Sequence, residues 1–150
     1  MSRRLGTLLA VGVVPWLVVL DPGAIDLVFA WGLFDARTVT FVSLLEYLFV
    51  YTLGPASLPG HLLAWPLGVL FYLGALANAS LSVVGREDRR ITALLLVLAA
   101  AMCLRLWWGL PSGGSPTVPL GAALLFAFVW WFHAEDLRGI APGAGRAIRA

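Results

Sequence analysis

Long apolar runs, separated by short polar segments, are the feature that most constrains this chain. Four runs are clear, and they cover residues 5–20, 61–84, 91–110 and 117–133. Each approaches the roughly 20 residues of helix that cross a hydrocarbon core of about 30 Å. None alternates with a period of two, and only helices or closed barrels satisfy every backbone polar group inside a bilayer. The runs therefore predict an all-α, polytopic integral membrane bundle of four to five transmembrane helices.

Composition supports a membrane environment. Hydrophobic residues make up 61% of the 150 residues, and charged residues make up 12%. A soluble domain typically contains about 45–50% apolar and about 25% charged residues. A soluble fold of this size could not bury so much apolar surface, so we expect lipid to contact it. The length fits one domain, which we expect to be a single transmembrane helical domain over residues 1–150.

The path of residues 39–53 is ambiguous. This segment is apolar enough to span a membrane, but it is short and carries Glu46 at its centre. It could cross the bilayer, form a re-entrant hairpin with residues 24–34, or lie along the interface. The first run, residues 5–20, has the appearance of a signal peptide, yet no small-x-small cleavage site follows it. We therefore expect it to be a retained span.

Arginine placement predicts the orientation, because positive charge stays on the cytoplasmic side. If residues 39–53 do not cross, the N-terminus is inside, and eight arginines are inside while only Arg37 is outside. If they cross, the N-terminus is outside, and seven arginines are inside while two are outside. The eight are Arg3, Arg4, Arg86, Arg89, Arg90, Arg138, Arg146 and Arg149. Both arrangements put the Gly85–Arg90 loop and the C-terminal tail in the cytoplasm and the Pro111–Pro116 loop outside. We therefore predict a multi-pass protein of the cell membrane with a cytoplasmic C-terminus.

Tryptophans fit this frame, because amphipathic rings favour the headgroup level. We expect a membrane-anchoring role for those near the outer helix ends and for those near the inner end of the last span. These are Trp65, Trp107 and Trp108 outside, and Trp130 and Trp131 inside.

Three stretches of the sequence carry a resemblance to a known family. They are residues 45–52 (LEYLFVYT), Trp65-Pro66, and residues 85–90 (GREDRR) with Thr92. Together they resemble an uncharacterised family of small multi-spanning membrane proteins from halophilic archaea, and the GREDRR loop is the most specific element. The resemblance covers most of the chain. It implies a membrane class and a source, and it implies no activity or active site.

Two charged residues stand inside apolar runs. Glu46 must pair, face water or take up a proton, and an intramembrane carboxylate is a candidate functional residue. Arg105 lies five residues from the end of its run, so its guanidinium either reaches the outer headgroups or joins an ion pair. The predicted partner is Glu46, with Asp21 or Asp26 as alternatives. If residues 39–53 lie at the interface, Glu46 simply faces solvent.

Two further groups of residues are candidates for contacts. Ala75 and Ala79 let helices approach closely, and Asn78 beside them can form a hydrogen bond across the contact, so these three are candidate helix-packing residues. Arg86, Arg89 and Arg90 form a candidate cytoplasmic contact loop for anionic lipid or a partner. A role in setting the orientation of the chain in the membrane would by itself also explain these arginines.

The sequence contains few signs of catalytic chemistry. It has no phosphate-binding glycine loop, no HExxH motif and no pair of cysteines, and Cys103 lies in an apolar run. His61 and His133 fall at opposite ends of their spans, so we expect interfacial histidines and not a shared metal site. We therefore predict no catalytic residues, no metal and no cofactor. The net charge of +2 follows the topology and does not indicate nucleic-acid binding.

These observations favour a non-enzymatic accessory or assembly subunit of a membrane complex. The alternative is a small permease or channel component acting as an oligomer, which needs Glu46, Asn78 or Arg105 to line a wet path. An intramembrane enzyme is third. The expected partners are the lipid bilayer and either a membrane protein or further copies of the chain.

Overall fold

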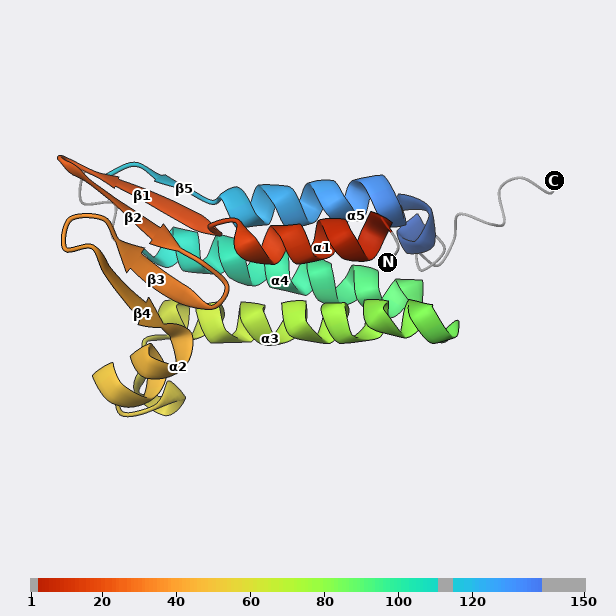
Figure 1. Ribbon diagram of the computed structural model, residues 1–150, viewed down its shortest axis with the longest axis horizontal. Coiled ribbons are helices and arrows are strands. Elements are labelled where there is room, and N and C mark those ends of the chain that lie inside the picture. Colours follow the sequence, from red (N-terminus) through yellow and green to blue (C-terminus); the bar gives the residue numbers. More distant parts are fainter. Residues whose placement is uncertain (1–2, 111–114, 139–150) are drawn as a thin grey trace.

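The computed structural model describes residues 3–110 and 115–138, and it has an α+β fold (Figure 1). Long helices lie side by side, and a five-stranded antiparallel sheet stands at one end of them. The helices are α1 (Arg3–Val13), α3 (Gly60–Ser80), α4 (Arg89–Gly109) and α5 (Leu120–Arg138). The predicted all-α membrane bundle is therefore wrong, because parts of the runs over residues 5–20 and 117–133, and of residues 39–53, form strands.

The sheet has the strand order β4-β3-β2-β1-β5. Its strands are β1 (Leu17–Asp21), β2 (Ala24–Val28), β3 (Gly32–Asp35), β4 (Thr40–Ser43) and β5 (Thr117–Val118). The first four pair with their neighbours in the chain, as short hairpins allow. Strand β5 lies just before α5 in the chain and pairs with β1, with Val18 opposite Val118. The sheet thus connects the N-terminal third of the chain to the last helix.

The predicted helical run over residues 5–20 is broken at Pro15. Helix α1 ends at Val13, because proline disfavours helical backbone at the residue before it and has no N–H to donate. The β-branched residues Val18 and Val19 then favour a strand. After Asp21, Pro22 presets a tight turn and Gly23 takes a φ of 86°, which glycine adopts without strain. Apolar content alone did not distinguish this strand from the end of a helix.

Residues 39–53 form no continuous helix. They comprise β4, the single turn α2 (Leu44–Glu46) and the π-helical segment η1 (Tyr47–Tyr51), and the short helix η2 (Pro55–Ser57) follows. This part of the chain projects from the sheet end of the molecule, beside the start of α3 (Figure 1). Residues 24–34, expected to form half of a re-entrant hairpin, supply β2 and most of β3 instead.

The remaining runs match helices more closely. Helix α3 continues into η3 (Leu81–Val84), and the chain turns at Gly85, which has a φ of 69°. The run over 117–133 begins with β5, and helix α5 starts only after Pro119. Most of the Pro111–Pro116 loop and the tail after Arg138, including Arg146 and Arg149, lie outside the described residues.

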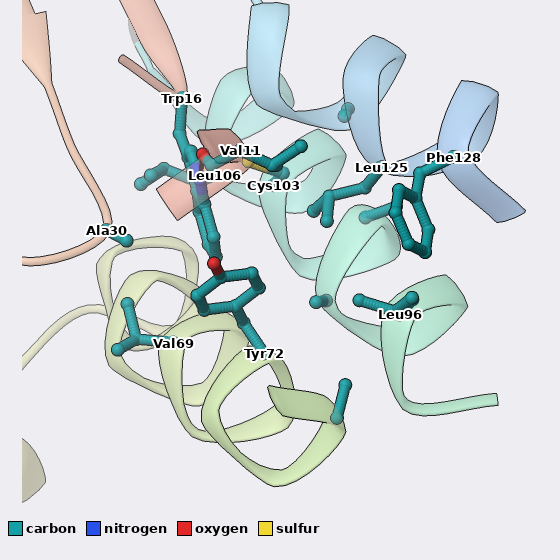
Figure 2. Close-up of a cluster of buried hydrophobic side chains, with 14 of the residues drawn as sticks. Val11, Trp16, Ala30, Val69, Tyr72, Leu96, Cys103, Leu106, Leu125 and Phe128 are labelled. Carbon is teal, nitrogen blue, oxygen red and sulfur yellow. Dashed lines mark hydrogen bonds between the residues drawn. The ribbon is translucent and has the colours of Figure 1, made fainter. Parts of the chain in front are cut away.

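A continuous apolar core joins the helices to the sheet. Trp16 points between the helices towards Tyr72 of α3, and Leu96 and Leu125 pack the neighbouring interface of α4 and α5 (Figure 2). Each of these four side chains is buried. The core lies mainly where α3, α4 and α5 face one another, so the outward helix faces are left uncovered.

Tryptophan indoles connect the helices to the sheet end. Trp65 Nε1 donates to the backbone oxygen of Phe29 at 2.9 Å, and Trp107 Nε1 donates to that of Thr117 at 2.8 Å. Trp65 is only 5% exposed, so the anchoring role predicted for it is wrong. Trp108, Trp130 and Trp131 are exposed and stay available for that role.

Candidate functional site

The predicted polar pair, Glu46 and Arg105, lies on two separate exposed positions. Glu46 closes the short helix α2, where its backbone N–H donates to Ser43 Oγ at 3.1 Å. Arg105 lies on the last third of α4, and its side chain is exposed. Within residues 3–110 and 115–138, no ion pair joins these two side chains. Their cooperation in a functional site stays a hypothesis.

Arg105 lines a groove between the start of α3 and the end of α4. The groove has a volume of about 640 Å³. Its lining residues are Gly60, His61, Ala101, Met102, Leu104, Arg105, Trp108 and Gly109. None of these is acidic, so the charge within the groove is positive.

Two glycines shape this groove. A Cβ atom added to Gly60 would lie 3.5 Å from Arg105 Nη2, so the guanidinium reaches across to the first residue of α3. A Cβ atom added to Gly109 would overlap the His61 side chain. The imidazole therefore packs directly on the backbone of α4, and His61 and Arg105 reach the same groove from two helices.

A second pocket lies at the opposite end of the helices. Its volume is about 430 Å³, and it contains Arg4 of α1, Arg89 of the predicted contact loop and Glu135 of α5. Trp130 and Trp131 complete its aromatic wall. The other two arginines of the contact loop, Arg86 and Arg90, are exposed. Acidic and basic groups are mixed here, in contrast to the first groove.

The candidate helix-packing residues lie between α3 and α4. Ala75 and Ala79 are buried. Asn78 Nδ2 donates to the backbone oxygen of Asp88 at 2.6 Å and to Thr92 Oγ1 at 2.8 Å. Asp88 in turn caps α4, since its carboxylate accepts from the Arg90 N–H at 2.9 Å. Asn78 thus connects the end of one helix to the cap of the next.

An acidic group on the sheet was not identified as a site from the sequence. Asp26 of β2 lies opposite Asp35 of β3, and Asp21 accepts a hydrogen bond from Ser115. Burial raises the pKa of Asp26, and the nearby charges of Asp35 and Asp21 raise it further. Hydrogen bonds from the Thr38 hydroxyl and from the Arg37 backbone N–H lower the pKa of Asp35. Recognising this pair requires the strand register.

The histidines do not share a site. His61 is the second residue of α3, at the sheet end. His133 is near the end of α5 and is only 1% exposed, with its ring centroid 5.8 Å from that of Phe128. The His133 side chain is therefore buried within the protein, and its predicted position near the membrane boundary stays a prediction. No cluster of three or more histidine, cysteine or acidic residues suited to a metal ion occurs in the described ranges. Cys103 is buried in the core.

Fold and surface together define a small α+β protein with uncovered apolar helices and a sheet at one end. A family model described as "Domain of unknown function (DUF8050)" matches residues 1–142, so the chain belongs to that family. No curated protein and no solved structure matches the chain. The family description names no activity, and the halophilic and archaeal source implied by the resemblance stays a prediction.

Proposed function

We propose that this chain is a membrane-embedded α+β protein, with its long helices in contact with lipid and its sheet towards one face of the bilayer. The observation that carries the proposal is a set of large apolar side chains exposed on the outward faces of the three longest helices. They include Leu67, Leu70 and Leu73 on α3, Ile91, Leu94 and Leu104 on α4, and Phe126, Trp130 and Trp131 on α5. In water, a surface of this kind would favour association or aggregation.

Helix length supports the same proposal. Residues Gly60–Val84 form 25 helical residues and α4 has 21, or about 37 Å and about 31 Å at 1.5 Å per residue. Both helices are long enough to cross a hydrocarbon core of roughly 30 Å. Only 28% and 39% of their most apolar windows are buried, whereas a core helix of a soluble protein is mostly buried.

Charge at the two ends of the helices supports an orientation. The end opposite the sheet carries the start of α1, the loop between α3 and α4, and the end of α5 (Figure 1). The arginines of these segments are Arg3, Arg4, Arg86, Arg89, Arg90 and Arg138, whereas the sheet end has Arg37 and Arg105. Because basic residues stay on the cytoplasmic side, we infer an external sheet and a cytoplasmic N-terminus and contact loop.

Membrane embedding is tested by washing membranes that contain the tagged full chain with alkaline carbonate and then with mild detergent. A protein held by its helices stays in the membrane pellet through carbonate and is released only by detergent. Release by carbonate would contradict the proposal. A peripheral membrane protein of the same host serves as the control and must be released in the carbonate step.

Within the membrane, we propose a non-enzymatic accessory or assembly subunit. The segment over residues 44–57, which projects from the sheet end, exposes large apolar side chains that no other described residue covers. Among them, Leu53 is 97% exposed. Leu45 and Phe49 are also exposed there. Such a patch is typical of a protein–protein contact. A conducting path within one chain is disfavoured, because Glu46 and Arg105 are on the surface and the interior between the helices is apolar.

The test is purification of the tagged chain from its native host in mild detergent, with mass spectrometry of the proteins that accompany it. We expect a stoichiometric partner with the wild type, and its loss in Phe49→Ser. Val84→Ser is the matched control, since Val84 is 67% exposed and Phe49 is 66% exposed. Isolation alone as a discrete homo-oligomer would favour the permease alternative and make Glu46 and Arg105 the first residues to mutate.

A further inference from the structure

The groove between α3 and α4 combines a cationic end with an apolar end. Arg105 and His61 supply the polar part, near the start of α3. Ala101, Met102 and Leu104 supply the apolar part, which runs back along α4 towards the middle of the helix. A ligand that fills both parts must itself have an anionic group attached to an apolar body.

Arg105 is a cation with no partner among the described residues. No acidic side chain lines the groove, and no ion pair or hydrogen bond to Arg105 occurs in the described part of the chain. Arginine is always charged, and a charge beside apolar surface needs an anion or water. The planar guanidinium presents paired donors that match the oxygens of a phosphate group. The groove therefore favours a phosphate over a neutral polar ligand.

The surroundings of Arg105 add to the attraction of an anion. The guanidinium extends to Gly60, the first residue of the 21-residue helix α3. No side chain caps this helix end, where Pro59 precedes the first turn, and helix N-termini carry a partial positive charge. His61 lies beside it, held against Gly109. Guanidinium, imidazole and helix end thus all border the same groove.

We infer that this groove binds the phosphate group of a phospholipid of the outer leaflet, with an acyl chain along Ala101 and Leu104. The inference rests on the proposed membrane embedding, which puts the last turns of α4 at the headgroup level. Trp108 is 83% exposed at the rim, where an indole suits the boundary between headgroups and acyl chains. A soluble phosphate would leave the apolar half of the groove empty. The other pocket is a weaker candidate, because Glu135 stands beside its arginines.

The test is a titration of the detergent-purified full chain with three probes, followed by native mass spectrometry and thermal unfolding. The probes are dioleoylphosphatidylglycerol, dioleoylglycerol with the same chains but no phosphate, and inorganic phosphate. We expect the phospholipid to bind and raise Tm, and the other two to do neither at equal concentration. Equal effects of the phospholipid and dioleoylglycerol would overturn the role of the phosphate. Equal effects of the phospholipid and inorganic phosphate would overturn the lipid.

Arg105→Gln is the decisive variant, and Arg37→Gln is its matched control at the same end of the molecule. Loss of charge-assisted hydrogen bonds should weaken phospholipid binding by about tenfold or more in Arg105→Gln. Arg37 does not line the groove, so its variant should bind as the wild type does. Equal affinities in the wild type and Arg105→Gln would overturn the inference. His61→Gln provides a second variant at the same site, with an expected smaller loss.

The carbonate wash separates this inference from the proposed function. Each variant is washed before it is solubilised. Retention in the membrane, together with unchanged lipid affinity in Arg105→Gln, refutes the phosphate site and leaves membrane embedding intact. Release of the wild type by carbonate refutes both.

Discussion

Trp16 and Tyr72 meet edge to face, with ring centroids 5.5 Å apart and an angle of 88° between the ring planes (Figure 2). This geometry is favoured for aromatic pairs. The contact joins two parts of the fold, because Trp16 lies between α1 and β1 and Tyr72 lies in the middle of α3. The Tyr72 hydroxyl extends further and donates to the backbone oxygen of Leu8 at 2.6 Å. This buried pair therefore contributes to the junction between the helices and the sheet.

Gly121 should be essential for this junction. A Cβ atom added there would lie 2.7 Å from Trp16 Cγ and 2.8 Å from Trp16 Cα, and the Trp16 backbone cannot move without disturbing β1. We expect Gly121→Ala to lower the free energy of unfolding by about 1–3 kcal/mol through overpacking. The measurement is the Tm of the purified protein in detergent.

Gly74→Ala is the matched control for that substitution. Gly74 is also a glycine within a long helix, but its added Cβ would be in ordinary contact with Leu95 Cδ1 at 3.4 Å. Alanine there should be neutral or stabilise the helix by about 0.5–1 kcal/mol. An equal loss of Tm in both variants would contradict the specific role of Gly121.

Tyr72→Phe should separate the hydrogen bond from the ring packing. The substitution keeps the edge-to-face contact with Trp16 and removes only the bond to Leu8. We expect a loss of about 1 kcal/mol, the usual net contribution of one hydrogen bond. Tyr72→Leu, which also removes the ring contact, should lower the Tm further. A Tm of Tyr72→Phe equal to that of the wild type would mean that the hydroxyl contributes nothing.

Asn78→Ala should loosen the connection between α3 and α4. It removes the amide bonds to Asp88 and Thr92, and the Thr92 side chain is only 1% exposed. We expect a loss of about 1–2 kcal/mol, because two hydrogen bonds between the helices are removed and each contributes about 1 kcal/mol. Ser80→Ala is the control, since the Ser80 hydroxyl bonds only to Ala77 of its own helix and is exposed. Similar Tm values for both variants would exclude a cross-helix role for Asn78.

Cysteine labelling in intact cells tests the orientation. The native Cys103 is buried, so it should not react and provides the background. Ala36→Cys, on the exposed loop between β3 and β4, should react with an impermeant thiol reagent. Val84→Cys, at the opposite end of the helices, should react only after the cells are opened. The reverse pattern would place the sheet in the cytoplasm and contradict the inferred topology.

The sequence predicted the long helices well and the sheet not at all. Residues 61–84 and 91–110 match α3 with η3 and α4 closely, because nothing in these runs interrupts the helical pattern beyond Pro66. The sequence did not reveal the first strand, because Val18 and Val19 are apolar as well as β-branched. By hydropathy alone these residues continue the first helix, although Pro15 ends it.

The candidate site shows the same limits. Asn78 could be chosen as a candidate packing residue because spacing within one helix is readable from the sequence, whereas its bonds to Asp88 and Thr92 needed the structure. Arg105 was identified as an exceptional charge, but its neighbours His61 and Gly109 come from contacts between helices that spacing does not reveal. Asp26 lies opposite Asp35 because of the register between β2 and β3. The sequence does not fix this register, because both faces of these strands are partly apolar.

The Asp26–Asp35 pair should make stability depend on pH in two opposite ways. Burial and neighbouring charges raise the pKa of Asp26 above 3.8 in the folded state, so its ionised form destabilises the fold, and stability is lost as pH rises through that pKa. Hydrogen bonds lower the pKa of Asp35 below 3.8, so its contribution is present above 3.8 and is lost as pH falls through its folded pKa. We expect Asp26→Asn to raise the Tm at pH 7, with the advantage shrinking as pH falls towards 3.8. Asp35→Asn should lower the Tm at pH 7, and a Tm series from pH 3 to pH 8 on both variants distinguishes the two signs. Opposite shifts would support the assigned causes, whereas shifts in the same direction would mean that the two carboxylates act only as one repulsive pair.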